Sequence, residues 1–419
     1  MLISTKIRTS SGLAAGLAVG LGLALGGCTD SSPNTTSTVS EDGVDLPLRT
    51  ADAEQKSAFR VGDSLFGTPF RAGDGLGPLY IRANCESCHQ EGGRGPGEVQ
   101  KAAWVQVDGV TPGAAMPFGN TLRPYSTDAQ VAPLVAPTDP PAPDQQLKLT
   151  TRMPAAVLGR GYLEAIDDAE IVRMEREQAA RSDAIHGRIN RVVYRSTESA
   201  DPQFHQFVLG QTNLIGRFGL KARQPTLDDF TADALVGDMG ITSPQRPNEL
   251  ANPAGITDDA KPGTDVTVDV VRRITAYLRL VEIPSRQPAL DTPRARSLFD
   301  QALCSACHTP SLRTRSDYPI AQLAAIAAPV FTDMLLHAMG TDLADGVLDE
   351  SAHSDEWRTA PLVGLRFQRS FLHDGRATDI ASAIVMHDGP GSQASESVAR
   401  FGSLTSDEQA ALIAFVSSL

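Results

Sequence analysis

The chain has 419 residues and a formal net charge of -13 at pH 7. An acidic surface argues against binding to nucleic acid and against broad adsorption to anionic lipid, because both are negatively charged. It is better suited to docking with a basic protein partner.

The first 27 residues have the pattern of a bacterial lipoprotein signal peptide. They contain Lys6 and Arg8, no acidic residue, and a run of small and apolar residues from Leu13 to Leu25. We interpret this run as a cleaved secretory signal and not as a transmembrane span of the mature protein. It ends in Leu25-Gly26-Gly27-Cys28, which looks like a lipobox and predicts cleavage before Cys28 and acylation of that cysteine. The alternative is an ordinary signal peptide followed by an unmodified cysteine.

Residues 28–50 follow the signal and are rich in Ser, Thr and Asp, with no apolar period. This composition predicts a flexible tether between the lipid and the body of the chain. Export and acylation together predict a periplasm-facing protein, anchored through Cys28 to a bacterial membrane that we expect to be the outer membrane.

A first half of the body, residues 51–285, opens and closes with a predicted helix. Residues 54–67 and 268–281 each place apolar residues on one side at helical spacing. Residues 91–150 hold many Pro, Gly and Thr and few periodic runs, so we interpret them as a long loop insertion. The stretch 131–146, with five prolines, should be irregular.

A second half, residues 286–419, repeats the arrangement in a shorter form. Helices are predicted at 292–303 and 406–419, the latter after the capping-box sequence Thr405-Ser406-Asp407-Glu408. The middles of the halves also echo each other, since Arg152-Met153-Pro154 in the first resembles Arg358-Thr359-Ala360-Pro361 in the second.

Each half carries the same five-residue signature after its opening helix. Cys85-Glu86-Ser87-Cys88-His89 and Cys304-Ser305-Ala306-Cys307-His308 both read C-x-x-C-H, the attachment pattern of c-type haem. Two thiols at this spacing can each bond a vinyl group, and the adjacent histidine then reaches the iron as its proximal ligand. The sequence therefore predicts two covalently bound haem c groups. The residues expected to hold them are Cys85, Cys88, Cys304 and Cys307, with His89 and His308 on the iron.

Two other uses of the four thiols are possible. They could form two local disulfides, or the two C-x-x-C pairs could hold a single zinc ion. Neither use explains why a histidine follows both pairs. A helix, a haem motif and a second helix folding back across the first make up a small cytochrome c domain. We therefore expect a mainly α fold with two cytochrome c-like haem domains in tandem, 51–285 and 286–419, and long loop insertions in the first.

The chain resembles the bacterial di-haem oxidoreductases, which are often labelled peroxidases or thiol oxidoreductases and lie within the superfamily of di-haem cytochrome c peroxidases. The matching stretches identify the family and not the reaction. One departure is Ile185-His186-Gly187-Arg188, where relatives usually carry a serine in place of the histidine. The matching stretches are residues 159–166, 216–222, 238–244, 356–359 and 371–376.

The sixth ligands of the two irons are predicted from position. His387 lies shortly before the closing helix, where cytochrome c domains supply this ligand, and the resemblance implies a methionine at a comparable place. Adjacent Met386 could replace it, or His387 could lie in a surface loop. For the first haem the comparable residue is Met239, in competition with Met153 and Met116 and with the ordinary role of methionine as core filler. If none of them binds, that iron is five-coordinate and open to peroxide.

Other polar residues have candidate roles around the haems. Glu164, by family position, could transfer the proton that peroxide cleavage requires, although an acid at a helix start is also common. His337 and His373 are expected to be structural or to support the ligands, and Trp357 could relay electrons between the halves or only pack. We expect His186, His205 and His353 to be solvated.

These features predict a lipid-anchored di-haem oxidoreductase of peroxidase-like activity. One haem would relay electrons, and the other, held by Cys85 and Cys88, would react with a small oxidant such as hydrogen peroxide. A small donor or acceptor cytochrome is the expected partner. One alternative is a pure electron-transfer protein, with both irons six-coordinate, that serves a respiratory or metal-uptake partner. Another is a haem oxidase acting on a protein or a sulfur substrate.

Overall fold

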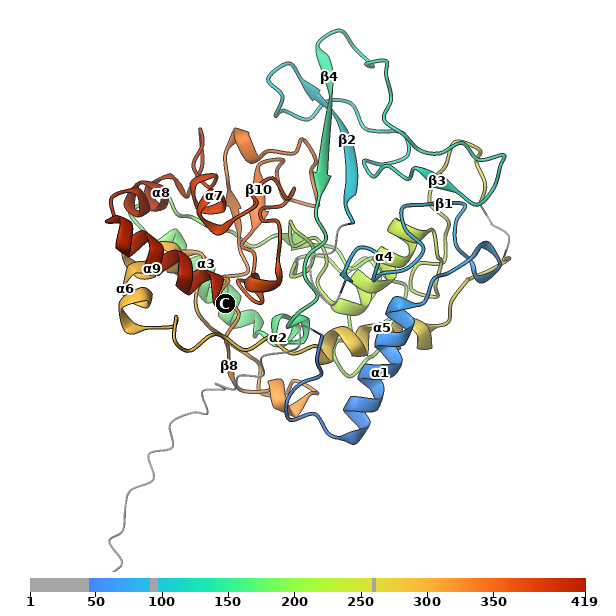
Figure 1. Ribbon diagram of the computed structural model, residues 1–419. Coiled ribbons are helices and arrows are strands. Elements are labelled where there is room, and N and C mark those ends of the chain that lie inside the picture. The colour runs from blue at the N-terminus through green and yellow to red at the C-terminus, as the bar shows by residue number, and fades with distance from the viewer. Residues whose placement is uncertain (1–44, 91–96, 258–260) are drawn as a thin grey trace, which may run out of the picture. The chain divides into compact units, whose positions relative to one another are not determined.

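The computed structural model describes residues 45–90, 97–257 and 261–419 (Figure 1). The predicted signal peptide, Cys28 and most of the predicted tether lie outside these residues. No helix within the described ranges is long and apolar enough to span a membrane.

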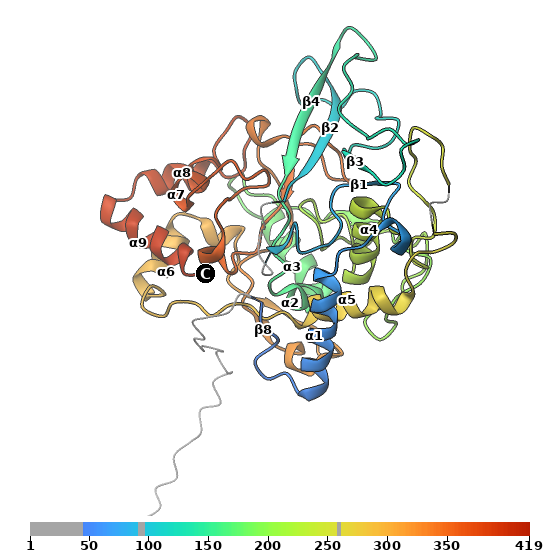
Figure 2. The same ribbon diagram turned by 45° about the vertical axis from the view of Figure 1, so that its right-hand side comes forward.

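A pair of crossing helices frames the first half. α1 (Ala53–Gly67) begins with a capping box between Asp52 and Gln55, and α5 (Val268–Leu280) packs across it (Figures 1 and 2). The crossing is close because a Cβ at Gly62 would lie 2.3 Å from the carbonyl oxygen of Arg273. The ring of Tyr277 fills the contact, with centroids 5.2 Å from Phe59 and 5.1 Å from Phe66. Both helices predicted from periodicity are confirmed here.

The second half has a matching pair. α6 (Pro293–Gln301) packs against α9 (Ser406–Ser417), and the rings of Phe299 and Phe415 meet edge to face at 5.5 Å. The capping box predicted at the start of the last helix is present, between Thr405 and Glu408. An opening helix followed by a haem motif and crossed by a closing helix therefore occurs twice.

The loop predicted over residues 91–150 is wrong in part. β2 (Val99–Gln106) and β4 (Gln145–Arg152) form an antiparallel pair, in register from Val99 opposite Arg152 to Gln106 opposite Gln145 (Figure 1). Ala103 and Val105 of this pair pack on Val347 from the second half. The sequence did not predict these two strands, because strands that pair across a long Pro-rich connection leave no local pattern along the chain.

The remaining elements are short. In the described residues every sheet has two antiparallel strands. The other helices are α2 (Arg160–Ala165), α3 (Asp168–Ala179), α4 (Leu227–Met239), α7 (Ile380–Val385) and α8 (Ser395–Gly402). The other strands are β1 (Leu79–Tyr80), β3 (Tyr125–Ser126), β5 (Arg191–Val192), β6 (Leu214–Ile215), β7 (Leu312–Arg313), β8 (Ala327–Ala328), β9 (Leu336–Ala338) and β10 (Glu356–Arg358).

The two halves share a hydrophobic core. Leu163 and Ile171 from the first half are buried in one cluster with Leu323 and Leu335 from the second. Backbone hydrogen bonds join the halves as well, and Arg188 exchanges two of them with Leu336 at 3.0 and 2.8 Å. The domain boundary near residue 285 stays a prediction, and the two halves bury apolar side chains in one common core.

Candidate functional site

The second C-x-x-C-H motif forms one wall of a cavity that is partly open to solvent. α6 ends at Gln301, and Leu303 then takes a left-handed conformation (φ 57°) that starts the tight turn of the motif. Within that turn the His308 N–H donates to the Cys304 carbonyl oxygen at 2.8 Å. Cys304, Cys307 and His308 thereby line a cavity of about 270 Å³ whose walls are mostly aliphatic and aromatic.

Two imidazoles in this cavity are oriented as metal ligands usually are. His308 Nδ1 lies 3.2 Å from the Phe331 carbonyl oxygen, and His387 Nδ1 lies 2.6 Å from that of Ala383. A carbonyl that accepts from Nδ1–H leaves the Nε2 lone pair free, which is the usual support for a histidine ligand. Burial lowers the pKa of His308 to about 4 and lowers the pKa of His387 as well. Both rings are thus neutral and can donate to iron at neutral pH.

The first motif has the same local geometry. The Cys85 N–H donates to the Phe66 carbonyl oxygen at the end of α1, and the His89 N–H donates to that of Cys85 at 3.0 Å. Burial, with a smaller contribution from the Arg160 charge, lowers the pKa of His89 to about 4. A backbone contact with Ala155 partly opposes that shift, although the buried Nδ1 meets no described group in good hydrogen-bond geometry.

The alternative uses of the thiols are not supported. The four motif cysteines are free thiols. Burial raises the pKa of Cys85 to about 12, of Cys88 to about 11 and of Cys304 to about 12, so these thiols stay protonated where no metal is bound. Within the described part of the chain, the one grouping with metal-ligand spacing joins Cys307 to Asp333 and His337, and it lacks the first motif. Thiols of this kind, beside neutral imidazoles in an apolar cavity, fit a haem.

The residues predicted as sixth ligands differ in how exposed they are and in what surrounds them. Met386, the alternative to His387, is 37 % exposed at the end of α7 and does not line the cavity, whereas His387 does. Met239 is buried at the end of α4, in a cluster against which Cys85 packs, so it remains a predicted ligand for the first haem. Its competitor Met153 packs against Gly375 and donates its N–H to the His373 carbonyl oxygen, which places it with the second half.

Glu164 is tied into a buried network. Its carboxylate accepts from Arg279 Nε at 2.6 Å, from the Tyr318 hydroxyl at 2.8 Å and from the Leu227 N–H at 3.0 Å. Burial alone would raise the pKa of Glu164, but the Arg279 guanidinium outweighs it and holds that pKa below its usual range. A carboxylate with its acceptors occupied has little capacity to shuttle protons, so its catalytic role remains a prediction that this geometry does not favour.

We expect Glu164→Gln to lower stability more than turnover. The substitution removes the closer of two carboxylates from the buried Arg279 and leaves only Asp201 at 3.8 Å, which costs about 3 kcal/mol in the free energy of unfolding. Urea unfolding measures this loss, and exposed Glu177→Gln is the control. Peroxide turnover per folded molecule should change by less than about tenfold. A hundredfold loss of turnover would instead show that Glu164 transfers a proton in the reaction.

The remaining histidines have mixed outcomes. His337 has both ring nitrogens occupied, by Gln393 at 2.8 Å and Asp333 at 2.9 Å, which agrees with a structural role. His373 lines the cavity and stacks on Trp357 with ring centroids 3.8 Å apart. His186 and His353 are exposed, as predicted.

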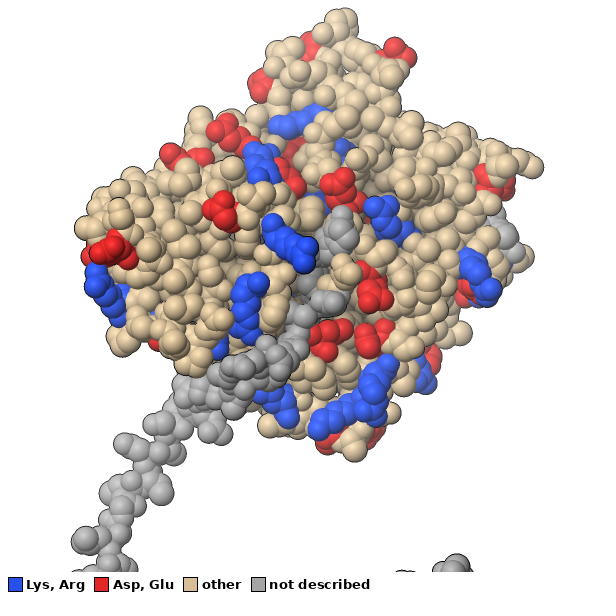
Figure 3. Space-filling view, in the orientation of Figure 1, with Lys and Arg blue, Asp and Glu red and all other residues tan. Residues whose placement is uncertain are grey.

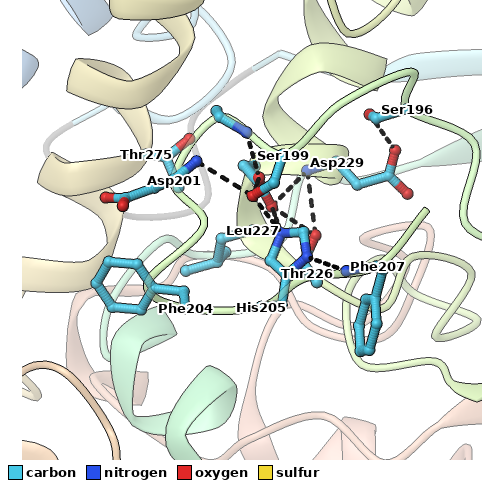
Figure 4. A network of polar contacts seen from close by, with 12 residues as sticks. Ser196, Ser199, Asp201, Phe204, His205, Phe207, Thr226, Leu227, Asp229 and Thr275 are labelled. Carbon is cyan, nitrogen blue, oxygen red and sulfur yellow. Dashed lines mark hydrogen bonds and ion pairs between the residues drawn. The ribbon is translucent and has the colours of Figure 1, made fainter. Parts of the chain in front are cut away.

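The prediction that His205 is solvated is wrong. Its side chain is 5 % exposed, and Nε2 lies 2.7 Å from Oδ1 of Asp228. Figure 4 shows the ring directed at the N-terminus of α4, beside Thr226 and Asp229. The surrounding sequence is polar, but those polar groups face inward and satisfy one another, which hydropathy along the chain does not reveal.

Two arginines that line the cavity were not predicted as site residues from the sequence. Arg160 and Arg358 are 8 % and 6 % exposed and line the cavity of the second motif. The sequence signal for Arg358 was present, because it stands in the echoed segment that leads to Pro361. Arg160 lies in Gly159-Arg160-Gly161, where nothing local shows which way the side chain points.

One comparison with known proteins, the family match, agrees with the site. A family described as "Di-haem oxidoreductase, putative peroxidase" matches residues 142–419. Two solved structures are similar over most of their length, but their TM-scores are too low to carry an argument. Hydrazine synthase of Kuenenia stuttgartiensis is 13 % identical, with a TM-score of 0.35 over 93 % of this chain and 98 % of that one. The diheme peroxidase BthA of Burkholderia thailandensis is 15 % identical, with a TM-score of 0.38 over 90 % and 87 %. No curated protein sequence matches the chain.

Proposed function

The chain belongs to the di-haem oxidoreductase family, and on that premise we propose that it is a lipid-anchored, periplasm-facing di-haem c-type cytochrome with peroxidase-like activity. In this proposal both haems are attached through their C-x-x-C-H motifs, in two tandem cytochrome c-like units. The site of Cys304 and Cys307 relays electrons. The site of Cys85 and Cys88 reacts with a small oxidant such as hydrogen peroxide.

The observation that carries the proposal is the pair of imidazoles in one apolar cavity. His308 and His387 each have Nδ1 at a backbone carbonyl and a free Nε2 in a cavity lined by Cys304 and Cys307. A haem supplies one-electron and oxygen chemistry when it is bound. Two neutral imidazoles would hold its iron in a closed, low-spin site, suited to electron transfer and poorly suited to binding an oxidant.

The first site differs in the ligand available. His89 has no imidazole counterpart that the sequence predicts, and Met239 offers a thioether, which binds iron more weakly than imidazole. A weak or absent sixth ligand leaves room for a small oxidant beside His89. The first site is therefore the one we assign to the reaction.

Spectra of the oxidised and reduced protein, recorded with and without peroxide or cyanide, test the assignment. We expect one of two haems to bind cyanide, and peroxide to oxidise the reduced protein rapidly. The comparison variant is His387→Ala, which should open the second site to cyanide as well. If neither iron binds either molecule in the wild type, while electron exchange with a small cytochrome stays fast, the pure electron-transfer function is correct.

The proposed partner is a small basic cytochrome, which the formal charge of -13 would attract. Figure 3 shows acidic and basic residues interspersed on the face in view, so that face offers no single acidic patch. The partner proposal therefore rests on net charge. Raising the ionic strength should slow electron exchange with a basic cytochrome.

Cys28→Ser tests the lipid anchor. We expect the wild type to fractionate with membranes and this variant to appear in the soluble periplasm, because the serine cannot carry the anchoring acyl chains. Immunoblots of cell fractions measure the shift. A wild-type protein that is already soluble would contradict the anchor, and it would leave the haem assignment intact.

A further inference from the structure

Two buried guanidinium groups line the cavity of the second motif, and neither has a carboxylate partner among the described residues. Arg160, at the start of α2, donates to the Ala156 carbonyl oxygen. Arg358, at the end of β10, donates to the carbonyl oxygens of Gly219 at 3.2 Å and Thr359 at 3.1 Å. No ion pair joins either side chain to a described residue, whereas buried Arg152 and Arg279 each reach a carboxylate.

The two positive charges also oppose each other. Burial, followed by the charge of Arg358, lowers the pKa of Arg160 to about 9. Burial lowers the pKa of Arg358 to about 10, and Asp333 opposes that shift from beyond ion-pair distance. The Asp333 carboxylate is already occupied by Gln178 at 2.6 Å and His337 at 2.9 Å. Buried like charges of this kind are costly unless an anion joins them.

The charged residues on the cavity wall are all positive. Arg160 and Arg358 are the only Lys or Arg on its described wall, and no Asp or Glu lines it. Arg160 also reaches toward the first site, since its charge contributes to the lowered pKa of His89. The arginine pair thus lies on the wall of the second site, and Arg160 alone is also within electrostatic range of the first.

We propose that Arg160 and Arg358 bind a propionate carboxylate of the haem held by Cys304 and Cys307, and that their charge raises the reduction potential of that haem. The proposal rests on the second haem site proposed above. A guanidinium binds a carboxylate through two parallel hydrogen bonds, and the surrounding apolar wall strengthens that contact. Positive charge beside a haem favours the reduced iron, which carries one positive charge fewer.

Redox titration of the purified holoprotein, without peroxide, tests this role. Arg160→Gln and Arg358→Gln should each retain two haems. At the wild-type midpoint potential, the ratio of reduced to oxidised second haem should fall about tenfold, which is ~59 mV for a one-electron couple. Arg358→Lys keeps the charge and should recover most of the potential, although it loses the paired hydrogen bonds.

The matched control is Arg217→Gln. Arg217 is equally buried, donates to the carbonyl oxygens of Leu163 and Ile166 and pairs with Asp168, and is not on the cavity wall. It should lower stability and leave both potentials unchanged. If the Gln variants lose the second haem while Arg217→Gln and Arg358→Lys retain it, propionate binding is supported. Gln variants with two haems and wild-type potentials overturn the proposal. Absence of peroxide activity would overturn only the proposed function.

Discussion

Replacing Cys304 and Cys307 together with alanine should halve the haem content, from two haems per chain to one. Each thiol is proposed to bond one vinyl group, and without both of them nothing holds the haem covalently in the second site. The pyridine haemochrome assay, normalised to protein mass, measures the loss. Ser305→Ala changes a residue between the two cysteines and should keep both haems.

The same double variant should also be far less stable. Its cavity of about 270 Å³ would lose the group proposed to fill it, and the apolar side chains that this group covers would be exposed to water. We expect a clear fall in the midpoint of thermal unfolding, which circular dichroism can follow. A wild-type chain with one haem, or a double variant that keeps two, would contradict the duplicated attachment.

His387→Ala should convert the second haem from low spin to high spin while both haems stay attached. The His387 imidazole follows α7, is half-buried and lines the cavity, and its Nδ1 lies 2.6 Å from the Ala383 carbonyl oxygen. Removing it would take away the imidazole proposed to hold the haem iron together with His308, and a weaker ligand field would favour the high-spin state. Electron paramagnetic resonance of the oxidised protein measures the change, with one low-spin signal replaced by a high-spin signal.

Met386→Ala is the control for that experiment, because Met386 is the neighbouring residue and is 37 % exposed. It should leave both signals unchanged. If Met386→Ala changes the spin state and His387→Ala does not, the adjacent thioether is the ligand. If neither changes it, the sixth ligand comes from another residue of the cavity wall, and His373 is the next to test.

Features that depend on neighbours along the chain were predictable from sequence. Helical periodicity located α1, α5, α6 and α9, because the 3.6-residue repeat is written into each segment by itself. The two C-x-x-C-H motifs were equally plain, since the spacing of thiols and imidazole within one turn is fixed by the backbone. The family resemblance followed from similar local stretches, and the family match over residues 142–419 confirms it.

Tertiary structure decided what those segments meet. β2 and β4 pair across a long Pro-rich connection, Glu164 meets Arg279 more than a hundred residues away, and His205 turns inward to Asp228. Arg160 and Arg358 come together on one cavity wall from different halves of the chain. Such contacts join residues far apart in sequence, and they form only when packing of the whole core selects them from many possible partners. The sequence by itself determined that the chain carries two C-x-x-C-H motifs. The fold decided which charged side chains and imidazoles lie beside the second of them.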